Sequence, residues 1–284
     1  DVSNAALQAV DLPHDFLIEN ENDLYETTDA WYLRTLDVPE SWSASCVLVR
    51  FDGVYMDCDV LLNGHIVCTH HYGYTAFDVD LTSLLLVGRN TLAVHIRHQS
   101  PNSRWYSGAG IYRDVTLHVL PKRHIPLDGV YVTTTHELES WTMTIDTELC
   151  GVKDNGVLTH VLLDGDVPVC DVTVEAAGDH ANAVMQVLSP KLWSPDAPNV
   201  DTLQTMLGNQ VIRQNVGFRD LTFTTDCGLL VNGAPVKLHG VCLHHDLGCL
   251  GSAFHEKAMR RQLRAMRQMG VNALRTSHNP PAKQ

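Results

Sequence analysis

The hydrophobic residues of this chain follow two different periods, and the change after Arg219 constrains the fold more than any other feature. From about Trp31 to Leu120, and again from about Gly129 to Phe218, apolar side chains recur at every second position. Period two is the pattern of β-strands with one buried face. After Arg219 come an apolar strand, a segment of helical period and a second apolar strand. The chain is therefore predicted to be mainly β, with a last region of a different class.

Residues 1–121 are predicted to form an antiparallel β-sandwich. An Asn63-Gly64 pair lies between alternating apolar residues, which is a strong signal for a tight hairpin because both positions need positive φ. Short strands with turn residues between them are typical of a sandwich. The alternation predicts one inward face made of Leu92, Val94, Ile96, Val115, Leu117 and Val119.

Residues 122–219 form a second period-two series, which begins after a connector flanked by Pro121 and Pro126. Its strand-like segments, with a further hairpin at Asp164-Gly165, have the number and spacing of an immunoglobulin-like sandwich. Two separate sandwiches fit the length of 284 residues, because domains commonly contain roughly 100–150 residues.

Residues 220–284 are predicted to start a parallel α/β domain. A hairpin about Asn232-Gly233 leads into an apolar strand, Val236–Leu243, and then a helix over 255–269 with Met259, Leu263 and Met266 on one face. Gly270 is a natural end of this helix, and the strand Val271–Leu274 completes a βαβ unit. One such unit cannot close a barrel or cover both faces of a sheet, so we expect this domain to be incomplete.

Composition excludes several classes of partner. A net charge of −13 with only 20 Lys+Arg argues against nucleic acids and anionic membranes. No apolar run approaches the ~18 residues of a membrane-spanning helix, and Asp1 does not open a signal peptide.

The eight scattered cysteines lack a CxxC pair, so we expect reduced, buried thiols in a cytoplasmic protein. A secreted or periplasmic protein with its signal peptide removed is the alternative.

Two polar clusters follow the ends of the two parallel strands, where barrel enzymes build their active sites. The first contains His244, His245 and Asp246, and the second runs from Arg275 to Asn279. A solvated or hydrogen-bonded histidine pair is an equal alternative for the first cluster. A metal site of one of these histidines with Asp246 or His278 is a further alternative, although the helical HExxH spacing is absent. The position of His278 after a strand end favours a functional role.

A third cluster lies in the loop of residues 102–115, where Gly108 and Gly110 accompany Arg104 and the aromatic residues Trp105, Tyr106 and Tyr112, which we expect to be exposed. Flat aromatic faces and hydrogen-bond donors suit the binding of sugar rings. The same residues could also pack the sandwich against a neighbouring domain, and the residue types alone do not separate the two readings.

Four stretches of the chain resemble glycoside hydrolase family 2, which includes β-galactosidases, β-glucuronidases and β-mannosidases. They are "RWYSGAGIYRDV", "LWSPDAPNVDTL", "VGFRDLTF", and "KLHGVCLHHD" through "GVNALRTSHNPP". The resemblance is greatest to the β-galactosidase branch. It implies a jelly-roll sugar-binding-type domain (1–121), an immunoglobulin-like domain (122–219) and the first βαβ unit of a (β/α)8 TIM barrel (220–284).

The resemblance also implies a role for individual residues. Arg275, inside the barrel, and Trp105 would support the pocket. Some members have an acidic residue where this chain has Ser103-Arg104, which affects how hydroxyls are recognised. No cofactor and no metal are implied. Substrate contacts would come from Arg104, His245, Asp246, His278 and Asn279.

The catalytic residues themselves are expected outside this chain. Retaining glycosidases need two carboxylates about 5–5.5 Å apart, and the family takes them from the fourth and seventh barrel strands, beyond Gln284. Asp246 has no partner carboxylate at an adjacent strand end, and Glu256 starts a helix on the outer side. We therefore expect an inactive N-terminal fragment of a retaining β-glycosidase, most closely a β-galactosidase, that is a homo-oligomer when complete. A β-glucuronidase, a β-mannosidase, and a non-catalytic carbohydrate-binding or assembly module are the alternatives.

Overall fold

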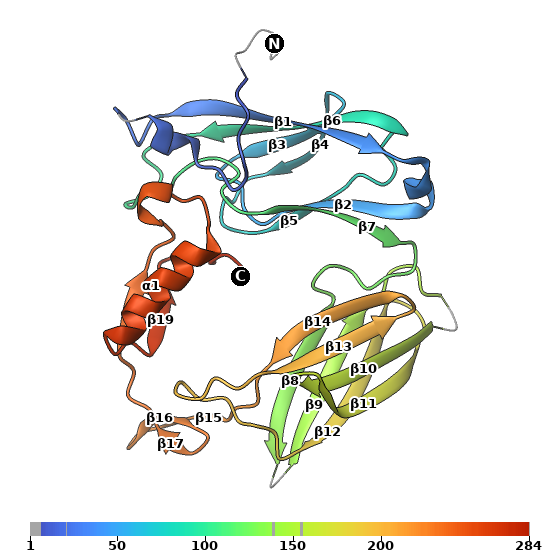
Figure 1. The fold of residues 1–284 in the computed structure, drawn as a ribbon, viewed down its shortest axis with the longest axis vertical. Coiled ribbons are helices and arrows are strands. Elements are labelled where there is room, and N and C mark those ends of the chain that lie inside the picture. Colours follow the sequence, from blue (N-terminus) through green and yellow to red (C-terminus); the bar gives the residue numbers. More distant parts are fainter. Residues whose placement is uncertain (1–6, 21, 138–139, 154–155, 284) are drawn as a thin grey trace. The chain divides into compact units, whose positions relative to one another are not determined.

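The computed structural model describes residues 7–20, 22–137, 140–153 and 156–283. They form two compact units that do not follow the order of the chain. Unit 1 contains residues 1–120 together with residues 239–284, and unit 2 contains residues 121–238. The predicted third region is thus divided, because residues 220–238 belong to unit 2 and the rest belongs to unit 1 (Figure 1).

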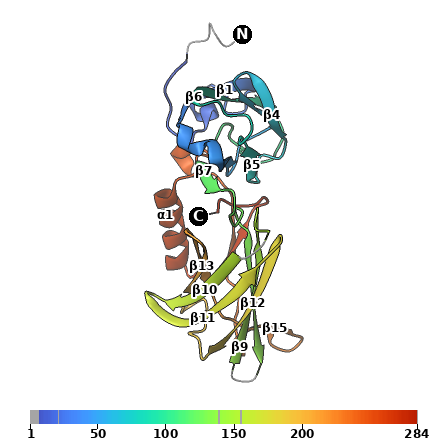
Figure 2. The ribbon, with the colours of Figure 1, turned by 90° about the vertical axis from the view of Figure 1, so that its right-hand side faces the viewer.

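Unit 1 contains a β-sandwich of two facing sheets (Figure 2). In strand order, the first sheet is β1 (Thr28–Val38), β6 (Gly88–His98), β3 (Cys58–Leu62) and β4 (His65–His70). The second is β5 (Phe77–Asp80), β2 (Ser45–Phe51) and β7 (Val115–Pro121). Short 3-10 turns, η2 (Phe16–Glu19) and η3 (Glu40–Ala44), precede β1 and β2. The core between the sheets includes Phe51, Val60, Leu81 and Ile96, each exposed by no more than 1%.

The hairpin predicted in this sandwich is confirmed, and the predicted inward face is confirmed in part. Asn63 and Gly64 join β3 to β4 with φ of 50° and 86°. Leu92, Val94 and Ile96 are buried, but Leu117 and Val119 are 40% and 37% exposed. β7 is an edge strand, and Leu117 faces a cavity of about 470 Å³ lined by both sheets rather than a packed neighbour.

Unit 2 contains the second sandwich. Its four-stranded sheet is β11 (Val167–Ala176), β10 (Gly156–Asp164), β13 (Asp201–Leu207) and β14 (Gln210–Val216). The three-stranded sheet is β12 (His180–Leu188), β9 (Ser140–Glu148) and β8 (Val130–Glu137). Met143, Ile145, Leu158 and Leu203 are fully buried between them. The predicted two-sheet sandwich is confirmed, including a turn with positive φ at Gly165 between β10 and β11.

A small sheet of β15 (Leu221–Thr224), β16 (Gly228–Val231) and β17 (Ala234–Pro235) ends unit 2. The predicted turn is present, since Asn232 and Gly233 have φ of 52° and 77° between β16 and β17. The side chains of β15 are all exposed, including Phe223 at 78%.

The C-terminal part of unit 1 is the predicted βαβ segment, although its first strand is shorter than the predicted Val236–Leu243, since residues 236–239 are not part of a strand. It consists of β18 (Gly240–Leu243), the short 3-10 turn η4 (Gly248–Leu250), the helix α1 (Glu256–Gln268) and β19 (Ala273–Thr276). The two strands are parallel, and Gly270 follows the helix with a φ of 88°. None of the described helices has the length and apolar character needed to span a membrane. No residue of α1 is fully buried; on its apolar face Met259 and Met266 are half-buried and Leu263 is 37% exposed.

The cysteines do not share one environment, and the expectation of uniformly buried thiols was wrong. Cys58 is buried in β3, whereas Cys227, Cys242 and Cys249 are exposed. Cys227 lies in a hairpin turn and Cys249 in the η4 turn, so neither is held within a strand core.

Candidate functional site

The two polar clusters predicted at the strand ends lie side by side. β18 and β19 pair in parallel with Leu243 opposite Thr276, and the Ser277 backbone N–H donates to the Leu243 carbonyl at 2.8 Å. Parallel strands carry their C-terminal ends to the same edge of a sheet. Residues 244–246 and 277–279 therefore leave that edge together, as the sequence predicted.

The loop of residues 102–109 contacts this edge through Trp105. The indole Nε1–H donates to Asp246 Oδ1 at 2.8 Å, and the indole stacks on the His244 ring with centroids 3.9 Å apart and planes 13° apart. The His278 ring meets His244 edge-on at 5.7 Å. Trp105 keeps 48% of its surface exposed, so part of the ring remains open to a ligand. Asp246 thus holds Trp105 in place.

His245 contacts the same loop through a hydrogen bond to Ser107. Its Nε2 lies 2.9 Å from the Ser107 carbonyl oxygen, which can only accept, so Nε2 must carry the proton. The Tyr74 and Tyr112 rings pack around the imidazole. Burial lowers the pKa of His245, and we therefore expect a neutral ring at neutral pH.

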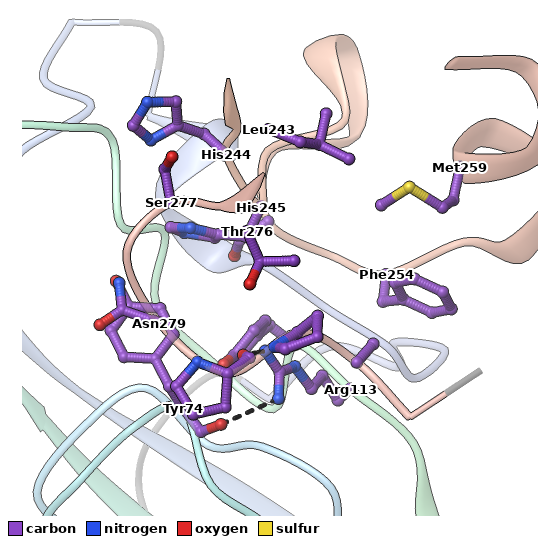
Figure 3. Close-up of a pocket in the computed structure, with 15 residues that line it drawn as sticks. Tyr74, Arg113, Leu243, His244, His245, Phe254, Met259, Thr276, Ser277 and Asn279 are labelled. Atoms are coloured by element: carbon purple, nitrogen blue, oxygen red, sulfur yellow. Dashed lines mark hydrogen bonds between the residues drawn. The ribbon is translucent and has the colours of Figure 1, made fainter. Parts of the chain in front are cut away.

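A small cavity of about 50 Å³ is lined by residues of the cluster, including His244, His245 and Asn279 (Figure 3). Arg113, only 4% exposed, forms part of its lining and donates to the carbonyl oxygens of Tyr74 at 3.0 Å and Pro280 at 2.7 Å. Its guanidinium also lies over the Tyr112 ring, 4.9 Å from the centroid, and burial lowers its pKa. Arg113 thereby ties the segment after β19 to the first sandwich.

The remaining predicted residues differ in how they are held. Asn279 Oδ1 accepts a hydrogen bond of 3.0 Å from the Tyr72 hydroxyl. Arg104 is exposed on the loop that carries Trp105. Arg275 is also exposed, and its Nη1 lies 3.8 Å from Cys242 Sγ. Hydrogen bonds from Ser277 and Arg275 lower the pKa of the Cys242 thiol.

Two aromatic residues were misjudged from the sequence, and several contributors were missed. Tyr106, expected to be exposed, is half-buried, because its hydroxyl donates to the buried Asp15 Oδ2 at 2.7 Å. Tyr112, expected to be exposed, is 1% exposed, because its ring packs against Tyr55 and Tyr74 and its hydroxyl donates to the Gly73 carbonyl at 2.8 Å. The missed residues are Asp15, Tyr72, Tyr74 and Arg113. A buried arginine or aspartate carries no signal in hydrophobic periodicity, and these four residues come together only through the tertiary fold.

The chemistry of this cluster suits a neutral, hydroxyl-rich ligand. Trp105 offers an aromatic surface, while His278, Asn279 and Arg104 offer hydrogen-bonding groups. The two nearby carboxylates have partners: Asp246 accepts from Trp105, and Glu256 forms an ion pair with Arg260 at 2.6 Å. Across the described ranges, no group of three or more His, Cys, Asp or Glu side chains could hold a metal ion, so the alternative metal site is not formed there.

Three family models match this chain. The model for "Glycosyl hydrolases family 2, sugar binding domain" matches residues 8–121. The model for "Glycosyl hydrolases family 2" matches residues 124–219. The model for "Glycosyl hydrolases family 2, TIM barrel domain" matches residues 224–284. The predicted fold class, two β-sandwiches followed by the start of a TIM barrel, is confirmed.

Known proteins from Bacteroides species resemble this chain over most of its length. A β-galactosidase of Bacteroides ovatus is 34% identical over 97% of the chain, which spans 36% of that protein. A β-glucuronidase of Bacteroides fragilis is 28% identical over 96% of the chain, which spans 44% of it. A crystal structure of a glycosyl hydrolase family 2 member from Bacteroides cellulosilyticus superposes with a TM-score of 0.91 at 30% identity, covering 100% of this chain and 43% of that one.

Proposed function

Because this chain belongs to glycosyl hydrolase family 2, we propose that it supplies one wall of the active site of a retaining β-glycosidase. The observation that carries the proposal is the contact between Trp105 on the sandwich loop and Asp246 at the end of the first parallel strand. The Trp105 ring stacks on His244, which the His278 ring meets edge-on, and Arg104 precedes Trp105 on the same exposed loop. A terminal sugar would lie against this wall, with its hydroxyls facing these polar groups.

The cavity next to these residues is lined by His244, His245 and Asn279 but not by Trp105 or His278, and it is too small to hold a sugar by itself. The cavity measures about 50 Å³, whereas ligand pockets typically measure about 300–1,000 Å³. Retaining hydrolysis requires a nucleophilic carboxylate and an acid/base carboxylate about 5–5.5 Å apart. Asp246 accepts a hydrogen bond from Trp105, and Glu256 pairs with Arg260 on the exposed helix α1, so we do not assign these roles to them. We assign both roles to barrel strands outside residues 1–284 of the parent enzyme.

Within the site, Arg104, His278 and Asn279 would bind sugar hydroxyls directly. His245 and Asp246 would act mainly by holding the loop, since the first binds the Ser107 carbonyl and the second binds the Trp105 indole. Trp105 and Arg275 would support the pocket. β-Galactosides are the preferred candidate substrates, supported by the 34% identity to a β-galactosidase over 97% of the chain. β-Glucuronides and β-mannosides are the second candidates.

The test is hydrolysis by the complete parent protein. Its kcat/KM is measured for nitrophenyl β-galactoside, β-glucuronide and β-mannoside under the same conditions, with retention of configuration followed by NMR. We expect the β-galactoside to have the highest kcat/KM and the first-formed product to be the β-anomer. A higher value for either of the other two sugars would reject the β-galactoside assignment alone. No turnover of any of the three would contradict the proposed function.

A further inference from the structure

A buried carboxylate that the proposed function does not use lies behind the sugar-facing loop. Asp15 is 1% exposed and accepts five hydrogen bonds. Its Oδ1 accepts from the Leu17 N–H at 3.1 Å and the Ala109 N–H at 3.0 Å. Its Oδ2 accepts from the Tyr106 hydroxyl at 2.7 Å, and from the Ser252 N–H at 2.8 Å and hydroxyl at 2.9 Å.

These donors come from three separate parts of the chain. Leu17 belongs to the turn that follows Asp15 itself, and Asp15 caps that turn. Tyr106 and Ala109 belong to the loop that carries Arg104 and Trp105, with Ala109 94 residues from Asp15. Ser252 lies after η4 in the segment between β18 and α1, 237 residues from Asp15. A single side chain therefore joins the sandwich loop to the start of the barrel.

The backbone around Asp15 leaves no room for a different arrangement. A Cβ added to Gly108 would collide with Ser252 Oγ and with Asp15 Oδ2, and a Cβ added to Gly251 would collide with Asp15 Oδ2 and Ile18. Both glycines also have positive φ, of 66° and 58°. Two loops thus use glycine where they approach the same carboxylate.

The charge of Asp15 matters as well as its shape. An ionised carboxylate only accepts, and it can satisfy several donors at once. Hydrogen bonds to an ionised group are roughly twice as strong as those between neutral groups. An asparagine of the same size must turn its N–H₂ group either to the Leu17 and Ala109 backbone N–H groups or to the Ser252 backbone N–H, and none of these can accept. The isosteric change therefore removes the acceptor from one side of this link while it keeps the volume.

We propose that Asp15 is a positioning residue that holds the Arg104–Trp105 loop against the barrel segment, so that the loop faces the sugar site. This inference rests on the proposed function. Two contacts on the same loop depend on its position: Trp105 with Asp246, and Ser107 with His245. Asp15 acts through them, since its own oxygens are enclosed by protein donors.

The kinetic test uses Asp15→Asn in the complete parent enzyme, with Asp23→Asn as the matched control. Asp23 is exposed, and its carboxylate accepts from the nearby Tyr25 N–H. We expect Asp15→Asn to lower kcat/KM about 10- to 100-fold, the scale of a displacement of about 1 Å at a reacting site, and the control to stay within about 2-fold. In a Trp105→Ala background the effect of Asp15→Asn should shrink to less than about 3-fold, because both changes disturb one loop.

A structural readout in the 284-residue chain separates this proposal from the proposed function. Asp15→Asn should speed hydrogen exchange at the amides of Ala109 and Ser252 and leave those of β6 unchanged. If the wild-type parent enzyme cleaves no glycoside, the proposed function fails, and the exchange data alone decide whether Asp15 joins the two segments.

Three results would overturn the proposal: unchanged exchange at both amides, unchanged kcat/KM, or a loss that is simply additive with Trp105→Ala. If Asp15→Asn does not fold, Ser252→Ala removes one donor and keeps the carboxylate. It should show the same changes at smaller size, and their absence would equally reject the proposal.

Discussion

His160 provides a quantitative test of the packing of unit 2. Its side chain is 0% exposed on β10, and Nδ1 lies 2.9 Å from Thr205 Oγ1 on β13. Nε2 is buried and has no hydrogen-bond partner among the described residues. Protonation would place a charge and a second N–H in this apolar site, and burial accordingly lowers the pKa of His160 to about 4.

The direction and size of the effect follow from linkage. An unfolded histidine has a pKa near 6.5, so the unfolded chain binds the proton more tightly than unit 2 does. The stability that comes from keeping His160 neutral is complete above about pH 6.5 and is lost as the pH falls towards 4. A difference of roughly 2.5 pKa units corresponds to about 3 kcal/mol.

The assay compares wild type with His160→Gln by urea unfolding at pH 7 and pH 4, followed by hydrogen exchange of β10 and β13. We expect the difference in unfolding free energy between wild type and variant to decrease by about 3 kcal/mol from pH 7 to pH 4. This corresponds to a change of roughly 1–3 M in the difference between their urea midpoints. Burial raises the pKa of Asp201 in the same sandwich, but this effect is common to both proteins and cancels. The control His136→Gln, at an exposed position, should show the same change of unfolding free energy with pH as the wild type. Equal pH dependence in wild type and His160→Gln would refute the reasoning.

Three further outcomes are expected. The 284-residue chain should release no nitrophenol from nitrophenyl β-galactoside, β-glucuronide or β-mannoside above a buffer control. Turnover that survives repurification and disappears on changing Glu256 or Asp246 would contradict this. In the parent enzyme, Arg104→Ala should lower kcat/KM roughly 10- to 150-fold without changing Tm, since a charge-assisted hydrogen bond contributes about 1.5–3 kcal/mol; a lower Tm with unchanged kinetics would make Arg104 structural. The amides of α1 should exchange faster than those of β10, because no residue of α1 is buried; uniformly slow exchange in a chain shown to be monomeric would show that this face is covered.

The parts of the site that could be predicted from sequence depend on local order along the chain. His244 to Asp246 and Ser277 to Asn279 were placed together because the ends of neighbouring parallel strands share an edge. The hairpins at Asn63-Gly64 and Asn232-Gly233 were predictable for a similar reason, since two adjacent residues must adopt positive φ. In each case the information lies within a few residues or in one repeating pattern.

The parts that could not be predicted depend on contacts between distant segments. Asp15 is buried because Ser252, 237 residues away, completes its set of donors, and nothing in the adjacent residues indicates that partner. Tyr112 was expected at the surface from its glycine-rich loop, yet the first sandwich and the barrel segment enclose it. Leu117 is the reverse case, a residue expected to be buried that is exposed. Periodicity indicates which way a residue faces but not whether another segment covers it.

The wide separation of Asp15 and Ser252 also affects the order of events during protein synthesis. At about 5–20 residues per second, Ser252 follows Asp15 out of the ribosome's catalytic centre by about 10–50 s. All strands of the first sandwich are complete by Pro121, and such sandwiches fold in about milliseconds to seconds. The nascent sandwich therefore folds while the Asp15 carboxylate still lacks two of its five donors, and the barrel segment docks onto a surface that already exists. In pulse-labelled nascent chains, protection of the Ser252 amide should appear after that of β6.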